Sequence, residues 1–309
     1  MSPQDGATAY LSFHRDELAA QALGGPGPKS ARMRPFMPDQ HREFFTLLPY
    51  LFVAAADERG WPVASVLVGA PGFVQSPDPV TLRVDSVADT GDPAAVGLTV
   101  GRDVALLGLD LTTRRRNRAN GQVAAVDGQG LSVHVTQSFG NCAQYIQTRR
   151  PTAATRMPEP VEHFDRLDDG ARALVAASDT FFVASRSRLE VGSDGGLDMS
   201  HRGGRPGFVG VHGDTLAIPD FRGNRFYNTL GNLLGDPRAG LLFIDFATGE
   251  LLQLQGRAEI DWTPGGAGPP GAERLWRFRI ERGWRRRDAF PFAWTFGDYA
   301  PTTLKTGVW

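Results

Sequence analysis

The residues with the clearest chemistry lie in a polar loop between a predicted strand and a predicted helix, at 218–238. The sequence IPDFRGNRFYNTLGNLLGDPR places Pro-Asp and Gly-Asn turns before a short apolar run that ends in Gly-Asp-Pro. Backbone N–H groups at a helix start, with side-chain donors beside them, suit a phosphate. The alternative interpretation is an ordinary capped surface helix. The side-chain donors of this loop are Arg222, Asn224, Arg225, Asn228 and Thr229.

A second basic stretch, TRRRNRANG at 113–121, contains four arginines and two asparagines. Isolated basic runs are usually solvated, so one interpretation is a charged surface hairpin. The other is that side chains of this stretch, Arg116 and Asn117 among them, reach the anion site formed by the later loop. Both interpretations remain open at the level of sequence.

The composition argues against several other kinds of site. The 309 residues include 33 Lys or Arg and 34 Asp or Glu, so the overall charge does not indicate a nucleic acid or a membrane as partner. The single cysteine, Cys142, excludes an internal disulfide and any multi-cysteine metal site; it is expected to be a buried structural thiol, and no metal is predicted. Because neither a long apolar run nor a signal peptide is visible, a cytoplasmic protein is expected.

The chain contains an internal repeat. PGFV occurs at 71–74 and again at 206–209, and ALLGLDLTT from Ala105 matches GLLFIDFAT from Gly240, so both pairs are 135 residues apart. Short β-branched and aromatic runs between Gly and Pro turns predict antiparallel strands in each copy. A mainly β fold with a few short helices is therefore expected. Its parts are an irregular N-terminal arm with one short helix at 1–34, two tandem β domains at 35–150 and 151–309, and a linker at 149–163.

The two copies differ at the polar loop. Where the second copy reads DFRGNRFYNTLGNL, the first reads SVADTGDPAAVGLTV, which lacks both arginines and all the asparagines. A duplicated fold that keeps the polar donors in one copy predicts one ligand site for each pair of domains.

Four stretches resemble a known family, the pyridoxamine 5'-phosphate oxidase-like flavoproteins with the FMN-binding split barrel. They are LDMSHRGGRPGFV, IPDFRGNRFYNTLGNLLGDPRAGLLFIDF, SFGNCAQYIQ and RRRNRANG, and they look like the signature of a bacterial, tandem-barrel, flavin-nucleotide-binding branch. The resemblance implies two split barrels packed as a pseudo-dimer within one chain, with FMN between them. The chain would then be a monomer or form a homodimer.

The resemblance also assigns roles to residues of this chain. Asn224 and Arg225 would bind the FMN phosphate, with Arg222, Asn228 and Thr229 in support. Pro219 and Asp220 would lie at the strand end that passes the flavin. A phenylalanine, Phe226, stands where the oxidases have a lysine. The residues that would face the ring or the ribityl chain are Ser200, His201 and Arg202, with Arg116 and Asn117 contributed by the first domain.

The function that the resemblance implies is flavin-dependent oxidoreduction of a small molecule through the flavin N5, with NAD(P)H or another donor supplying electrons. His201 is a weak candidate for a proton donor, and the alternative for it is an ordinary loop histidine. Two other functions stay open: a flavin carrier without turnover, and a split barrel that binds haem or the deazaflavin F420.

Overall fold

The computed structural model describes residues 10–89, 91–189, 195–263 and 268–309, so that residues 1–9 of the N-terminal arm lie outside it. The helices are α1 (Arg15–Gly24), α2 (Asp39–Thr46), α3 (Asp169–Ala177) and α4 (Asn228–Gly235). The strands of the first half are β1 (Tyr50–Ala56), β2 (Pro62–Val68), β3 (Val74–Asp78), β4 (Thr81–Val84), β5 (Asp103–Asp110), β6 (Arg115–Asp127) and β7 (Gly130–Gly140). The later strands are β8 (Arg149–Ala153), β9 (Glu162–Phe164), β10 (Thr180–Arg186), β11 (Leu197–Gly203), β12 (Gly210–His212), β13 (Thr215–Phe221), β14 (Arg238–Ile244), β15 (Leu251–Asp261), β16 (Ala272–Arg286) and β17 (Phe292–Phe296).

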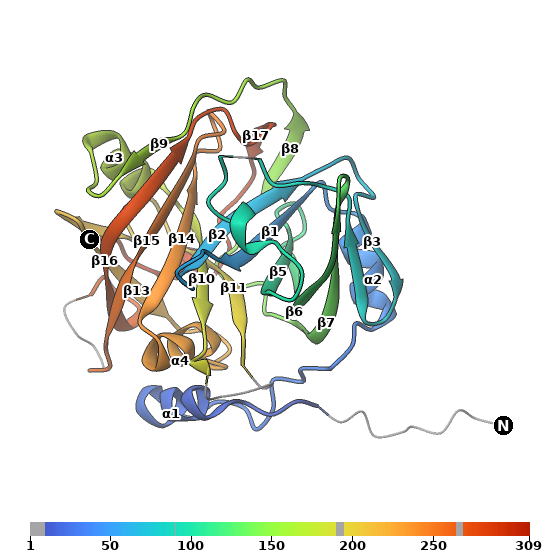
Figure 1. The fold of residues 1–309 in the computed structure, drawn as a ribbon. Helices are drawn as coiled ribbons and strands as arrows, with labels where there is room; N and C mark the ends of the chain where they lie inside the picture. Colours follow the sequence, from blue (N-terminus) through green and yellow to red (C-terminus); the bar gives the residue numbers. More distant parts are fainter. Residues whose placement is uncertain (1–9, 90, 190–194, 264–267) are drawn as a thin grey trace.

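The main strands form two antiparallel sheets with one topology (Figure 1). The first sheet has the order β2-β1-β5-β6-β7-β4-β3, and the second has the order β11-β10-β14-β15-β16-β13-β12. Both sheets carry a β-bulge at the same place, between Asn120 and Gly121 in one and between Gln255 and Gly256 in the other. These bulges are 135 residues apart, so the sequence repeat is a structural repeat. The predicted fold class, mainly β with two tandem domains of one kind, is confirmed.

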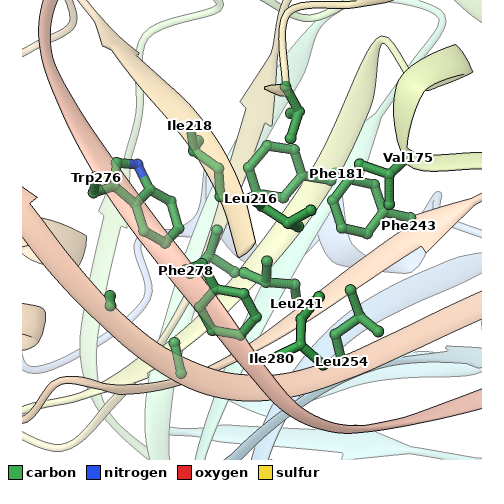
Figure 2. Packing of buried hydrophobic residues seen from close by; sticks show 14 of the residues in the cluster. Val175, Phe181, Leu216, Ile218, Leu241, Phe243, Leu254, Trp276, Phe278 and Ile280 are labelled. Carbon is green, nitrogen blue, oxygen red and sulfur yellow. The ribbon is translucent and has the colours of Figure 1, made fainter. Parts of the chain in front are cut away.

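Each sheet has a core of its own, built from the apolar strand faces that the sequence alternation predicts. Figure 2 shows the core of the second domain, where Phe181, Trp276 and Phe278 pack with aliphatic side chains from neighbouring strands. β1 and β10 are buried along nearly their whole length, because one face of each covers its own core and the other face meets the opposite domain.

A third core lies between the two sheets. At its centre Phe52 of β1 stacks on Phe182 of β10, with ring centroids 3.7 Å apart. These phenylalanines occupy the same position in the matching runs YLFVAA and TFFVAS. The contacts around them are reciprocal, because β14 lies against β2 and the equivalent strands β5 and β11 lie against each other, so the two domains are related by an approximate two-fold axis. Gly240 of β14 lies against the backbone of β2, and a Cβ there would come within 2.6 Å of the Pro62 carbonyl oxygen. The domains therefore pack backbone to backbone at this contact.

The structure decides or refines the sequence-based expectation for three segments. Of the two interpretations left open for 113–121, it supports contact with the second domain, because most of the stretch belongs to β6 and Arg118 bonds to Asp198 and Ser200 of β11. The linker 149–163 includes β8, which pairs with β17, and the start of β9, which pairs with β16. The N-terminal arm contains the predicted short helix, α1, and this helix packs against α4 of the second domain (Figure 1).

Two general features of the described residues concern their helices and their ionisable side chains. None of its helices has both the length and the apolar character needed to cross a membrane. Among the described residues there is also no cluster of three or more His, Cys, Asp or Glu side chains that could hold a metal ion.

Replacement of Phe182 by alanine tests the core between the sheets. Phe182→Ala removes a fully buried ring and its stacking contact with Phe52. We therefore expect the free energy of unfolding to fall by about 3–5 kcal/mol. The matched control is Phe296→Ala, because Phe296 is 45% exposed, and a change below about 1 kcal/mol is expected there. Guanidinium unfolding followed by tryptophan fluorescence measures both. Equal losses for the two variants would contradict a close-packed interface.

Candidate functional site

A polar cavity lies between the two domains and contains most of the residues that the sequence singled out. Its walls come from β6 and the loop after β7 in the first domain, and from β11, β13, the loop 222–227 and the start of α4 in the second. It has about 850 Å³ of empty space when the open mouth is included. The predicted site residues that line it are Arg116, His201, Arg202, Pro219, Asp220, Asn224, Arg225, Asn228 and Thr229.

Three of the predicted site residues do not line the cavity. Asn117 neighbours Arg116 on β6, and successive side chains of a strand point to opposite faces, so Asn117 lies beside Gly140 instead. Ser200 is buried behind the wall, where its hydroxyl accepts hydrogen bonds from Arg118 and Thr229. Arg222 contributes its carbonyl oxygen, which accepts a hydrogen bond from the Tyr145 hydroxyl at 2.9 Å.

Arg116 carries the strongest indication of a ligand. Its Nε atom is buried without a hydrogen-bond partner, and no described carboxylate lies within ion-pair distance of its guanidinium. Burial, together with the nearby positive charges of Arg118 and Arg202, lowers the pKa of Arg116 to about 9, so the group stays protonated at pH 7. A buried cation without an anion is costly. An anionic ligand at this position would supply the missing counter-charge.

His201 lies beside Arg116 and is almost fully buried. Its Nδ1 is 3.3 Å from Nη1 of Arg116; since a guanidinium can only donate, Nδ1 accepts and the ring proton is on Nε2. Nε2 is buried without a partner in the described structure. Burial, and then the charges of Arg116, Arg202 and Arg149, lower the pKa of His201 well below its usual range. The ring is therefore neutral, which suits a hydrogen-bond donor to a ligand better than a source of protons.

The charges of the lining arginines and of the carboxylates that pair with them do not balance. Three carboxylates pair with arginines of the cavity, at distances between 2.5 and 3.7 Å. Five guanidinium groups against these three carboxylates leave an excess of two positive charges, which matches a phosphate monoester dianion. The arginines are Arg116, Arg118, Arg202, Arg225 and Arg274, and the acids are Asp198, Asp220 and Glu273.

The loop before α4 is held in an uncommon backbone conformation. Arg225 and Tyr227 have φ angles of 58° and 60°, and Tyr145 across the mouth has 61°. Non-glycine residues rarely adopt this left-handed region, and each costs on the order of 1 kcal/mol. The side chain of Asn224 stabilises the turn by accepting a hydrogen bond from the Phe226 N–H at 3.1 Å. Arg225 is paired with Glu273 at 3.0 Å and so is only partly available to a ligand.

The first two side chains of α4 line the cavity but are hydrogen-bonded within the protein. Asn228 donates a hydrogen bond to Glu17 of α1, and Thr229 donates one to Ser200 at 2.8 Å. The N–H groups in the first turn of a helix have no partner inside the helix. Of the backbone and side-chain donors that the sequence indicated at this helix start, the side chains of Asn228 and Thr229 are already engaged with Glu17 and Ser200.

The sequence-based prediction did not include several residues that line the cavity. Arg118 follows Arg116 by two positions, and the two-residue period of a strand could have identified it. Arg274 and Tyr145 had no such signal, because only the sheet pairing and the loop after β7 bring them to the cavity. Cys142 also lines the cavity and is exposed, so the expectation of a buried structural thiol was wrong.

The approximate two-fold axis predicts a second cavity, at the position equivalent to the first. Side chains fill this position, the second place of the pair. Ser65 and Gln253 stand 135 residues from Ser200 and Arg118, respectively, and so correspond to them. Both Ser65 and Gln253 donate hydrogen bonds to the carboxylate of Asp92, which is buried.

Arg286 occupies the centre of this second place. The strand registers pair Asn117 with Gly140 and Leu252 with Arg285, so Arg286 corresponds to Asn141, which lines the true cavity. Its guanidinium pairs with Asp92 at 2.9 Å and with Asp89 at 2.5 Å. In the second place Arg286 thus has two carboxylate partners, whereas Arg116 in the first has no described one.

The chain was also compared with known proteins. No protein-family model and no curated protein sequence matches it. Solved structures that it is similar to include an FAD-binding protein from Mesorhizobium loti, at 14% identity over 41% of this chain and 97% of that one, with a TM-score of 0.28.

Two more of these structures have similar values. HupZ of Group A Streptococcus is 12% identical over 41% of this chain and 99% of its own, with a TM-score of 0.31. A protein of Corynebacterium glutamicum assigned provisionally to the pyridoxamine 5'-phosphate oxidases is 14% identical over 41% and 98%, with a TM-score of 0.26.

Replacement of Arg116 by glutamine tests whether the cavity binds anions. We expect inorganic phosphate to raise the melting temperature of the wild-type protein and to have little effect on Arg116→Gln. Without phosphate the variant should be about as stable as the wild type or more stable, because the uncompensated charge is gone. Arg150→Gln, at an exposed arginine, is the matched control and should respond like the wild type. An unchanged phosphate response in Arg116→Gln would contradict the assignment.

Proposed function

We propose that the cavity between the domains binds FMN and that the protein is an FMN-dependent oxidoreductase acting on a small molecule. The observation that carries the proposal is Arg116, a partly buried arginine whose buried Nε has no hydrogen-bond partner and whose guanidinium has no described carboxylate partner. The resemblance of the loop 218–238 to the flavin-nucleotide-binding signature names the anion as the FMN phosphate. Orphaned buried Nε atoms of Arg116, Arg202 and Arg225 fit such a group.

The residues that would hold the phosphate come from both domains. Arg116 reaches in from β6, Arg202 from β11, and the first N–H groups of α4 complete the set. Charge-assisted hydrogen bonds from arginine to phosphate are the strong kind, and bidentate geometry makes them specific. Asn224 and Arg225 would then border the phosphate, and the Nε2–H of His201 would donate a hydrogen bond to the ligand.

The chemistry of the bound cofactor would be hydride or electron transfer through the flavin N5. The contribution of this chain would be to bind and orient the cofactor, and to exclude water from the inner end of the cavity with the buried wall of β11 and β13. Tyr145 and the loop 222–227 border the open mouth, where a small substrate and an electron donor such as NAD(P)H would arrive. A flavin carrier has the same binding site, and it differs only by lacking turnover.

The absorption spectrum and a cofactor titration test this function. The purified protein should be yellow or take up FMN stoichiometrically at one per chain, since the second place is filled by Arg286. Arg116→Gln should weaken FMN binding roughly tenfold to a hundredfold, which corresponds to about 1.5–3 kcal/mol, while riboflavin binding stays unchanged. Arg225→Ala should have a smaller effect because Glu273 already pairs with Arg225.

The possible outcomes separate the alternatives. A colourless protein without affinity for FMN, or a Soret band from haem, would overturn the proposal. Reduction of the bound flavin by NAD(P)H, followed by oxidation with a quinone or nitro compound, supports an enzyme. FMN binding without any such reduction supports the carrier.

A further inference from the structure

The N-terminal segment 14–27 contacts the loop before α4 at Arg225 and Tyr227, and it contacts α4 itself. We propose that this segment, α1 with the turn GGPG after it, is a clamp that positions the phosphate-binding loop 225–232, and that Glu17 is its positioning residue. The proposal rests on the proposed function, because it concerns the same cavity.

The turn after α1 holds the strained part of the loop. The carbonyl oxygen of Gly24 accepts a hydrogen bond from the Tyr227 hydroxyl at 2.7 Å and another from Arg274 at 2.9 Å. Gly27 lies against the carbonyl group of Arg225 so closely that any side chain at position 27 would overlap it. The left-handed backbone of Arg225 and Tyr227 is thus stabilised from outside the loop.

Glu17 connects α1 to the start of α4. Its carboxyl group is 2% exposed, closes a capping box by accepting from the His14 N–H at 2.9 Å, and accepts a second hydrogen bond from Asn228. The helices cross closely here, because a Cβ on Gly231 would come within 2.7 Å of the Cα of Glu17. His14 also contacts Asn232 of α4 at 3.1 Å.

The charge of Glu17 affects both the clamp and the ligand. The charged and titratable groups that face it are His14 on the preceding turn, Asp198 on β11 and Arg118 on β6. Burial first, and then the charge of Asp198, raise the pKa of Glu17 to about 8. The pKa of Glu17 is thus higher in the folded protein than the value of 4.5 for the unfolded chain. Docking of α1 is therefore strongest below pH 4.5, and this stabilisation is lost as the pH rises through about 8. Ionised Glu17 would also repel a phosphate dianion.

The first test is the pH dependence of FMN affinity. In the wild type we expect affinity to fall roughly threefold to tenfold between pH 7 and pH 9 as Glu17 ionises. Glu17→Gln keeps the size of the side chain without the charge, so its affinity should fall by no more than about twofold over this range, the part that arises from Arg116 with its pKa of about 9. Asp39→Asn, at an exposed acid in the first turn of α2, is the matched control and should follow the wild type. Identical pH profiles for the wild type and Glu17→Gln would overturn the role of Glu17.

The second test changes the turn of the clamp. Gly27→Ala forces the loop at Arg225 to shift, so we expect FMN and inorganic phosphate to bind at least tenfold more weakly. Gly128→Ala is the matched control, because a Cβ at Gly128 meets no atom within 4 Å, and it should bind like the wild type. Equal affinities of Gly27→Ala and the wild type would overturn the clamp.

Hydrogen exchange in the full-length protein without ligand separates this proposal from the proposed function. If the clamp exists, Gly27→Ala should speed the exchange of amides in α4 and the loop 225–232 and leave those of α2 unchanged. This outcome is expected even if the cavity proves to bind an anion other than FMN. Faster exchange confined to α1, with the loop unaffected, would overturn the clamp whatever the ligand is.

Discussion

Phe52 and Phe182 stack at the centre of the core between the two sheets, and this contact determines where every other part of the cavity lies. The two rings come from equivalent strands, so their packing brings the sheets together about an approximate two-fold axis. Gly240 allows the backbones of β14 and β2 to meet without an intervening side chain. At this close approach, arginines on β6 reach β11 of the other domain, where Arg118 bonds to Asp198 and Ser200.

The two-fold relation creates two equivalent places, and the chain uses them differently. In one, Arg286 forms a buried ion pair with Asp92, and Gln253 donates a hydrogen bond to the same carboxylate. In the other, Arg116 lacks such a partner. A filled place stabilises the fold, because buried charges are tolerated when they are paired. The unfilled place stays available for a ligand at the cost of some stability, which is typical of binding sites.

The backbone around the cavity also lowers the stability of the protein. Of the six non-glycine residues with positive φ in the described chain, three line it: Tyr145, Arg225 and Tyr227. Local strain persists only where the surroundings hold the backbone in place. Here the surroundings are the N-terminal helix α1 and the turn after it, which belong to neither sheet but pack on α4. A segment without an obvious role in the sequence is thereby part of the site.

The sequence by itself determined the strands, the tandem repeat and the loop before α4, because alternation, turn residues and matching runs are local signals. It also indicated that only one copy keeps the polar donors. It did not reveal which donors face the ligand: Asn228 and Thr229 turn away to Glu17 and Ser200, and Asn117 lies on the opposite face of its strand. Only the tertiary structure decided that Arg116 would stand beside His201 without a described counter-ion, since that depends on which strands of two separate sheets meet. Charge pairing between distant segments is set by packing across the domain interface, and no local pattern in the chain encodes it.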